Sequence, residues 1–532
     1  MSWRINLVFT LIFFFSAALL SKLFCIQVLQ NDFYKALAQG LFSSPNESQT
    51  ERGEIFLKDG EPLAINKDFT LVFASPPKIL DAEKTAETLS EILHFDKDLI
   101  LEKLKVDFLY SPIKNKLTQE EIDSLKNLKL PGIYLTQERL RYYPQESLAS
   151  QIVGFLGAQG SGQYGLEEYY QEILKGSSEG TDLAITIDYD IQFMAEKLLD
   201  RAKENLSIEE GQIIVMDPNS GKILTLANFP NFNPNNYQEY ATKGDLGIFK
   251  NRATQDFFEP GSVFKGITMA AALNEGAITP ETTYIDKGIV EIGGWPIYNY
   301  DNRVWGEKTM TEVLEKSINT GAVFAEKQLG HELFLQYIEK FGFFEPTGID
   351  LPENYSENRE FKKGYEINFA TASFGQGIEM TPIQLARAYS VIANGGKLVE
   401  PYLVELTEVR PQSIPEESVI SSKTASQLTA MLVSVVENGY AKGARIPGYY
   451  VAGKTGTGQI SFSALGVDKP GYSEKTIQTF VGFAPAFDPQ FLILIKLNNP
   501  KTKTAEYSAV PIFHDLAEYI VHYYQIPPDY EL

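Results

Sequence analysis

The stretch Glu259-Pro260-Gly261-Ser262-Val263-Phe264-Lys265-Gly266 organises the whole sequence, because it joins a backbone turn to an apolar segment. The proline–glycine pair interrupts regular structure, and the apolar run that starts at Ile267 predicts a buried helix. Ser262 then lies in the first turn of that helix, where unpaired backbone N–H groups favour negative charge. Lys265 follows three residues later on the same face, within reach of the serine hydroxyl.

A serine becomes a nucleophile when a base takes its proton. A lysine desolvated among apolar neighbours can have a pKa low enough to act as that base. The same spacing also fits a helix N-cap followed by a solvated lysine, so S-x-x-K alone is a weak indication of catalysis. The chain has only four histidines, and none has the spacing of a zinc site. A Ser-His-Asp triad is therefore disfavoured, which makes a lysine base more plausible.

Two later motifs could complete such a site. Ser317-Ile318-Asn319 places a hydroxyl and an amide two residues apart, so both can face one cleft, although a polar helix-to-loop junction has the same pattern. Lys454-Thr455-Gly456-Thr457 follows a predicted strand in which Lys454 and Gly456 share a face. Because Gly456 has no side chain, we expect a substrate backbone to lie against this strand edge. Lys454 offers a positive charge for a carboxylate, although K-T-G alone also fits an ordinary edge-strand turn.

The composition excludes several classes of function. The chain has 532 residues, 44% of them hydrophobic, which is enough for two or more packed domains. Its formal net charge of -22 disfavours a nucleic-acid partner, because phosphate binding needs clustered Lys and Arg. The single cysteine, Cys25, excludes an internal disulfide and a cysteine metal cluster. We expect neither a metal nor another cofactor.

The N-terminus predicts a membrane anchor. An apolar run extends from Ile5 to Leu20, and Lys22 can snorkel to the interface while apolar residues continue beyond it. A cleaved signal peptide is the alternative, but the continued apolar character favours an uncleaved helix within residues 1–30. Arg4 predicts that the N-terminus stays cytoplasmic and that the rest of the chain lies outside the cell membrane.

The remaining chain reads as α+β. Glycines and serines at 176–180 predict a boundary between a first region, 31–178, and a second region, 179–532. Hairpins are predicted at 52–64 and 212–227, and strands at 479–484 and 491–497. Helices are predicted at 190–205, from Thr381-Pro382 onward, at 422–438 with Ser422 as N-cap, and at 512–524.

In the order S-x-x-K, S-x-N, K-T-G, the three motifs form the signature of serine β-lactamases and penicillin-binding proteins. The chain resembles a class B penicillin-binding protein over nearly its whole length. Shared blocks include Arg52-Gly53, Asp59-Gly60, Leu63-Ala64, 141–144, 165–167, 186–188, Met216-Asp217-Pro218 with Gly221, 251–253, 347–352, 374–377 and 381–384. The resemblance implies a transmembrane helix, an elongated mixed pedestal domain of the dimerisation type, and a transpeptidase domain. The latter would be an antiparallel sheet with flanking helices and a helical subdomain.

Within that family, 259–265 and 374–377 resemble the septal, FtsI-like branch more than the elongation branch. Ile318 stands where the septal branch often has a second serine, and Gly458 where alanine is common. Neither difference removes a functional group. They therefore affect the assignment to the septal branch and not the expected reaction.

The resemblance implies a D,D-transpeptidase that cross-links peptidoglycan stem peptides ending in D-Ala-D-Ala through an acyl-enzyme on Ser262. Lys265 would be the base, and Ser317 with Lys454 would pass a proton to the leaving amine. Asn319 would hold the peptide amide and Lys265. Lys454, Thr455 and Thr457 would bind the terminal carboxylate beside Gly456, with backbone N–H groups of Ser262 and Thr457 as the oxyanion hole. Penicillin would trap the same serine.

Several alternatives remain open at this point. An elongation-type transpeptidase, a β-lactamase or D,D-carboxypeptidase, and a catalytically silent β-lactam sensor share these motifs. A β-lactamase needs a second base for deacylation, which the sequence does not identify. No glycosyltransferase module precedes the catalytic region, so the resemblance implies a glycosyltransferase partner, together with membrane proteins of the division complex.

Overall fold

A computed structural model of the chain describes residues 2–31, 34–35, 52–176, 180–405 and 418–531. Their contacts define two compact units, one of Met1–Arg52, Ile65–Tyr142 and Ser177–Glu179, the other of Gly53–Ala64, Tyr143–Gly176 and Gly180–Leu532. The predicted boundary near residue 178 falls on 177–179, outside the described residues. The division at residues 30 and 178 therefore stays a prediction.

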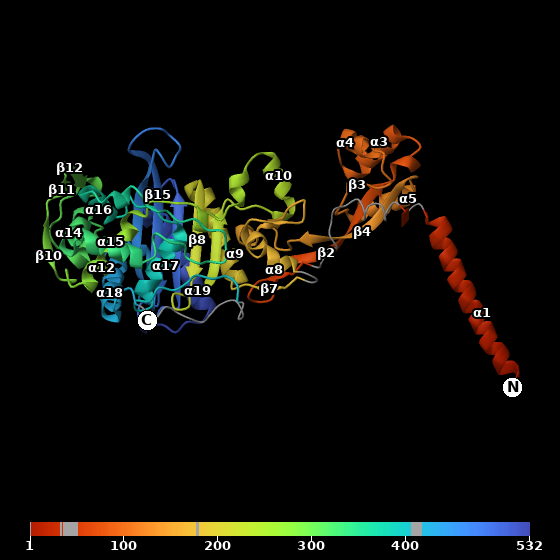
Figure 1. Ribbon diagram of the computed structural model, residues 1–532. Coiled ribbons are helices and arrows are strands. Elements are labelled where there is room, and N and C mark those ends of the chain that lie inside the picture. The colour runs from red at the N-terminus through yellow and green to blue at the C-terminus, as the bar shows by residue number, and fades with distance from the viewer. Residues whose placement is uncertain (1, 32–33, 36–51, 177–179, 406–417, 532) are drawn as a thin grey trace. The chain divides into compact units, whose positions relative to one another are not determined.

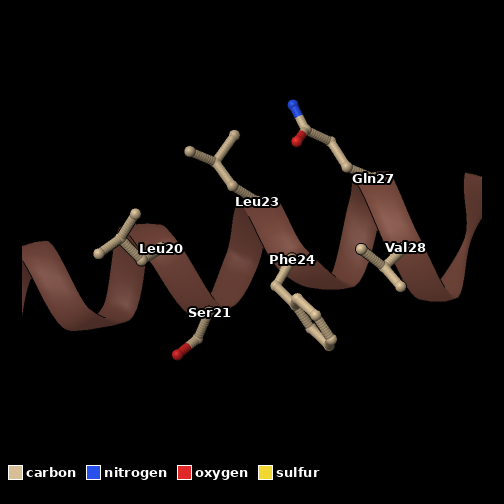
Figure 2. Close-up of a pocket in the computed structure, with 6 residues that line it drawn as sticks. All are labelled: Leu20, Ser21, Leu23, Phe24, Gln27 and Val28. Carbon is tan, nitrogen blue, oxygen red and sulfur yellow. The ribbon is translucent and has the colours of Figure 1, made fainter.

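The first unit begins with α1 (Ser2–Phe24), which a π-helical turn extends over Cys25–Leu29. Within the described part of the chain, Asn6–Val28 is the one stretch long and apolar enough to cross a membrane. Figure 2 shows a shallow hollow on this helix that is lined by side chains of the helix alone, namely Leu20, Ser21, Leu23, Phe24, Gln27 and Val28. The predicted apolar N-terminal helix is confirmed.

The rest of the first unit is a small sheet with helices. Strand β2 (Pro62–Ala74) pairs antiparallel with both β3 (Ser111–Lys114) and β4 (Ile133–Tyr142). Its helices are α3 (Ala82–Leu93), α4 (Lys97–Leu104) and α5 (Gln119–Leu128). Thr118 and Glu121 form a capping box that starts α5, which satisfies two otherwise unpaired N–H groups. The core between sheet and helices consists of aliphatic residues such as Val72, Leu89 and Ile100.

A five-stranded antiparallel sheet forms the centre of the second unit (Figure 1). Its order is β14 (Ala452–Ser461), β15 (Tyr472–Ala484), β16 (Phe491–Asn498), β8 (Glu210–Met216) and β9 (Ile223–Phe229). Strands β16 and β8 are almost completely buried, which explains why β16 reads as a continuous apolar run rather than an alternating one. The two hairpin strands predicted within 212–227 and the strands at 479–484 and 491–497 are confirmed.

Helices cover both faces of this sheet. On one face lie α9 (Tyr189–Leu206) and α19 (Ala509–Tyr523), which also contact each other. On the other lie α17 (Pro382–Ala393), α12 (Lys265–Asn274) and α18 (Ser422–Asn438). The central helix α12 is buried from Lys265 to Leu273, as its apolar sequence requires.

A helical subdomain packs around α12. It contains α13 (Met310–Glu315), α14 (Asn319–Leu329), α15 (His331–Lys340) and α16 (Glu366–Ala372). Two small hairpins accompany these helices, β10 (Thr283–Asp286) with β13 (Gly306–Thr309), and β11 (Ile289–Ile292) with β12 (Trp295–Tyr298). Several short elements lie between residues 53 and 187: β1 (Ile55–Phe56), β5 (Phe155–Leu156), β6 (Gly162–Gln163), β7 (Leu183–Ala184), α6 (Ser150–Val153), α7 (Gly165–Tyr169) and α8 (Gln171–Lys175). Two more short helices, α10 (Tyr237–Thr242) and α11 (Arg252–Gln255), follow β9.

The predicted helix ends need small corrections. The cap of α17 is as predicted, since the Thr381 hydroxyl accepts from the Gln384 N–H. The N-cap of α18 is Ser421, not Ser422, because the hydroxyl of Ser421 accepts from the Thr424 N–H. The last helix begins at Ala509, three residues before its predicted start.

Candidate active site

The nucleophile segment is a tight turn that leads into a buried helix. Ser262 lies in a short 3₁₀ helix, Gly261–Phe264, which continues directly into α12. Gly261 has φ = 59°, and its N–H donates to the Gly375 carbonyl at 3.0 Å. A Cβ on Gly375 would lie 2.2 Å from the Gly261 carbonyl oxygen, so only glycine fits there. The turn therefore fixes Ser262 in place while leaving it partly exposed to a substrate.

The side chain of Lys265 is completely buried and points at the groups that the motifs predicted. Its Nζ lies 2.9 Å from Ser262 Oγ, 2.8 Å from Asn319 Oδ1, 2.7 Å from the Ser317 carbonyl oxygen and 3.2 Å from Ser317 Oγ. None of these partners is a carboxylate. The lysine is thus fully buried and held by neutral oxygens beside the serine hydroxyl.

This arrangement matches the hydrogen-bonding capacity of an uncharged amine. Asn319 donates from Nδ2 to the Tyr298 carbonyl at 2.9 Å, which turns its Oδ1 towards Lys265 as an acceptor. The Asn319 Oδ1 and the Ser317 carbonyl can only accept, so they take the two N–H groups of a neutral amine. The amine lone pair can then accept the Ser262 O–H, as the prediction of Lys265 as the base requires.

Burial also acts on the pKa of this lysine. Desolvation lowers the pKa of Lys265 well below its ordinary 10.5, and the neighbouring charge of Lys454 lowers it further. Desolvation likewise lowers the pKa of Lys454 to about 7. The two lysines thus favour an uncharged Lys265 next to Ser262.

Ser317 and Asn319 sit at a junction between two helices. Ser317 has φ = 53°, uncommon for a residue other than glycine, and it turns the chain from α13 into α14. The buried carboxylate of Asp286 holds this junction, because it accepts from the Thr320 hydroxyl at 2.7 Å and from Asn299 Nδ2 at 2.9 Å. Contacts from Asp286 on β10 therefore hold the unfavourable backbone conformation of Ser317 in place.

The third motif lies on β14, at the edge of the large sheet. The Nζ of the fully buried Lys454 donates to Ser317 Oγ and to the Thr455 carbonyl, both at 3.0 Å. A Cβ on Gly456 would lie 2.9 Å from the Pro260 carbonyl oxygen and 3.1 Å from Val263 Cγ1. The position of a side chain at 456 is therefore filled by the nucleophile segment, and glycine allows β14 to approach it. The expectation that a substrate backbone lies along this strand edge stays a prediction.

Thr457 follows on the same strand and is partly exposed. Its hydroxyl oxygen accepts the Ala505 N–H at 3.2 Å, so the hydroxyl proton remains free to point elsewhere. Thr455 is nearly buried on β14. Both threonines, with Gly456, lie on the strand that runs past Ser262.

The structure thus brings Ser262, Lys265, Ser317, Asn319 and Lys454 to one place, with Thr455, Gly456 and Thr457 beside them. Their chemical roles stay predictions. Sequence reasoning missed the Tyr298 carbonyl, Asp286 and the Ala505 N–H. The first and the last are backbone groups with no residue signature, and Asp286 is separated from its partner Thr320 by 34 positions.

Two family profiles match the chain. The family described as penicillin binding protein transpeptidase domain matches residues 211–518, and the penicillin-binding protein dimerisation domain matches residues 47–187. The first alone spans more than half of the chain and contains every residue of the three motifs.

Curated relatives and solved structures agree with these profiles. Stage V sporulation protein D of Bacillus subtilis is 32% identical over 94% of the chain and 82% of its own length. Peptidoglycan D,D-transpeptidase FtsI of Escherichia coli K12 is 28% identical over 99% of the chain and 93% of its own length. Penicillin binding protein 3 of Mycobacterium tuberculosis, solved with aztreonam, superimposes with a TM-score of 0.70 at 26% identity, over 91% of the chain and 98% of that structure. The chain therefore belongs to the penicillin-binding protein transpeptidases, as a class B member of the FtsI-like branch.

Proposed function

We propose that the protein is a serine D,D-transpeptidase that cross-links peptidoglycan stem peptides through an acyl-enzyme on Ser262. The observation that carries the proposal is the 2.9 Å contact between Lys265 Nζ and Ser262 Oγ, made by a lysine that is buried among neutral oxygens. The names of the relatives support the peptidoglycan substrate, and the titles of two solved relatives, in complex with aztreonam and ampicillin, support β-lactams as inhibitors.

In the acylation step, Lys265 takes the proton of Ser262 as Oγ forms a bond to the penultimate D-Ala carbonyl carbon. The backbone N–H groups of Ser262 and Thr457 stabilise the oxyanion, a contribution of about 10²–10³-fold for one donor. The C–N bond to the terminal D-Ala then breaks. Ser317, beside both lysines, passes a proton to the departing amine, while Asn319 holds the peptide amide.

Substrate orientation comes from β14. Lys454, Thr455 and Thr457 bind the terminal carboxylate, and the Thr457 hydroxyl can donate because its oxygen already accepts the Ala505 N–H. In the second step, the amine of a neighbouring stem peptide attacks the acyl carbon, loses a proton to the base and releases Ser262. The new amide bond is the cross-link.

A fluorescent penicillin tests the acyl-enzyme directly. Membranes containing wild-type protein should show a covalently labelled band, and Ser262→Ala should show none. Ser220→Ala, a change in the β8–β9 turn, is the matched control and should label normally. An unlabelled wild type, or labelling that survives in Ser262→Ala, would overturn the proposal.

The setting of the reaction is a further part of the proposal. The FtsI names favour a septal role, in which depletion produces filaments of undivided cells, whereas rounded cells would indicate the elongation role. The apolar helix α1 would anchor the protein in the cell membrane by a single pass, with the N-terminus cytoplasmic and the catalytic unit outside. A glycosyltransferase and membrane proteins of the division complex would be its partners. Protease added to spheroplasts should digest the catalytic unit, and its protection would contradict this orientation.

A further inference from the structure

Glu259 lies three residues before Ser262, and the proposed mechanism does not use it. Its carboxylate accepts a hydrogen bond from the Tyr472 hydroxyl at 2.9 Å and another from the Gly377 N–H. Tyr472 is the first residue of β15. A single carboxylate therefore connects the nucleophile segment, the 375–377 turn and the hairpin formed by β14 and β15.

These three segments are packed too closely to move independently. The Gly261 N–H donates to the Gly375 carbonyl at 3.0 Å, and the adjacent Phe258 exchanges two backbone hydrogen bonds with Met380. On the other side, a Cβ on Gly261 would lie 3.4 Å from the Gly458 nitrogen, at the residue after Thr457. If the end of the β14–β15 hairpin moved, β14 would therefore also move relative to the turn that carries Ser262.

The end of the β14–β15 hairpin needs the hydrogen bond to Glu259 because the pairing between its two strands is irregular there. Regular register between β14 and β15 holds from Ala452 to Gln459, then shifts before Ser461 pairs with Tyr472. The position of β14 relative to Ser262 is therefore set at two points. One is the close approach at Gly456, and the other is the Tyr472–Glu259 hydrogen bond beyond the register shift. Thr457 lies between them.

The surroundings of Glu259 make this hydrogen bond costly to lose. Burial and, to a smaller extent, the nearby carboxylate of Glu379 raise the pKa of Glu259, while Tyr472 and the Gly377 N–H stabilise the ionised form, and the net pKa is about 7. Among the described ion pairs, none involves Glu259. Its charge is held by hydrogen bonds, so removing a donor leaves a partly buried acceptor unsatisfied.

We propose that Glu259 and Tyr472 are positioning residues that hold the second half of β14, which begins at Thr457, at a fixed distance from Ser262, so that the N–H groups of Ser262 and Thr457 can bind one oxyanion. This rests on the proposed function. The pair touches no substrate. It acts by keeping two backbone donors in register, and misplacement by about 1 Å can cost on the order of 10²-fold in rate.

The test compares acylation by fluorescent penicillin in purified full-length protein, with the rate constant and the labelled fraction measured separately. We expect Tyr472→Phe and Glu259→Ala each to slow acylation by about 10-fold, a part of the loss of one oxyanion donor. The double variant should be no slower than Glu259→Ala, because that change already removes the contact with Tyr472. Glu259→Gln keeps the side-chain length and one acceptor oxygen, so it should acylate faster than Glu259→Ala.

Lys475→Gln is the matched control. Lys475 lies on β15, three residues after Tyr472, and forms an ion pair with the exposed Glu209. Its replacement therefore removes a contact of the same strand that is not directed at the segment of Ser262. It should acylate like the wild type. A wild-type rate in Tyr472→Phe, additive losses in the double variant, or a Glu259→Gln variant as slow as Glu259→Ala would each overturn the proposal. So would a loss confined to the labelled fraction, because that indicates unfolding. An unlabelled wild type would instead refute the proposed function.

Discussion

Two buried lysine environments in the second unit differ in how the ammonium charge is compensated. Lys496, on β16, donates to Gln212 Oε1 at 2.9 Å and Asn498 Oδ1 at 2.8 Å. Burial lowers its pKa, but Glu210 and Asp256 raise it, and the result is about 8. Lys265 and Lys454 have neutral oxygens as partners, and the charge that acts on Lys265 is that of Lys454.

We propose that this difference separates a structural lysine, Lys496, from a functional one, Lys265. Acidic neighbours keep a buried lysine charged and bound to its acceptors. Without them, burial favours the neutral amine, and a neutral amine has the lone pair that a base needs. Burial alone therefore does not identify the base, whereas burial without a carboxylate beside a serine hydroxyl does.

The largest effect is expected at Lys265. Replacement by Arg keeps a positive charge that cannot be lost, and replacement by Met removes the nitrogen. Both should slow penicillin acylation by about 10²–10⁴-fold, the usual contribution of a general base. Rapid-mixing measurement of the acylation rate checks this expectation. Near wild-type acylation in Lys265→Arg would show that the neutral form is not required.

Lys454→Met should slow acylation and yet stabilise the fold. Because the pKa in the folded state, about 7, is below the ordinary 10.5, the charged form opposes folding. That cost is complete below pH 7 and disappears as the pH rises to the unfolded-state value. We expect a gain on the order of 2–4 kcal/mol at pH 6 and a smaller gain at pH 9. Denaturant titrations at the two pH values measure it, and destabilisation at both would contradict the prediction.

Lys496→Met should stabilise the fold less than Lys454→Met. The pKa of Lys496 is depressed less, to about 8, and the change leaves the oxygens of Gln212 and Asn498 without their donor, a cost of about 1–3 kcal/mol in the free energy of unfolding. Acylation at permissive temperature should stay near the wild-type rate, because this lysine makes no described contact with Ser262 or Lys265. A large loss of acylation in folded protein would remove the distinction between the two environments.

The smallest effect is expected at Thr479, which pairs with both Gly456 and Lys496 across the sheet. Its buried hydroxyl has no described hydrogen-bond partner. Thr479→Val removes an unsatisfied polar group with little change in shape, so it should stabilise the fold by about 0.5–1 kcal/mol without changing acylation. Thermal denaturation measures the change in stability, and a penicillin acylation assay on the same variant measures the rate. Destabilisation would show that a partner for this hydroxyl exists.

Much of this fold could be predicted from local patterns. The buried helix after Ser262, the hairpin within 212–227 and the cap of α17 each depend on residues close in sequence. The order of three short motifs was enough to indicate that distant segments meet. The hairpins at 283–309 and the Tyr472–Glu259 contact could not be predicted, because Glu259 and Tyr472 are 213 positions apart and neither is part of a motif. Gly456 was recognised as a place of close approach, but the approaching partner could be identified only from the structure.

The account depends on an uncharged Lys265 in the resting enzyme, and the pH dependence of acylation measures this most directly. A base must be deprotonated to act, so the acylation rate should rise with pH through the pKa of Lys265. We predict that this rise is complete well below the ordinary lysine value of 10.5 and that it is absent in Lys265→Met. A rate that keeps rising up to that ordinary value would show a lysine that is charged at neutral pH, which would contradict the account.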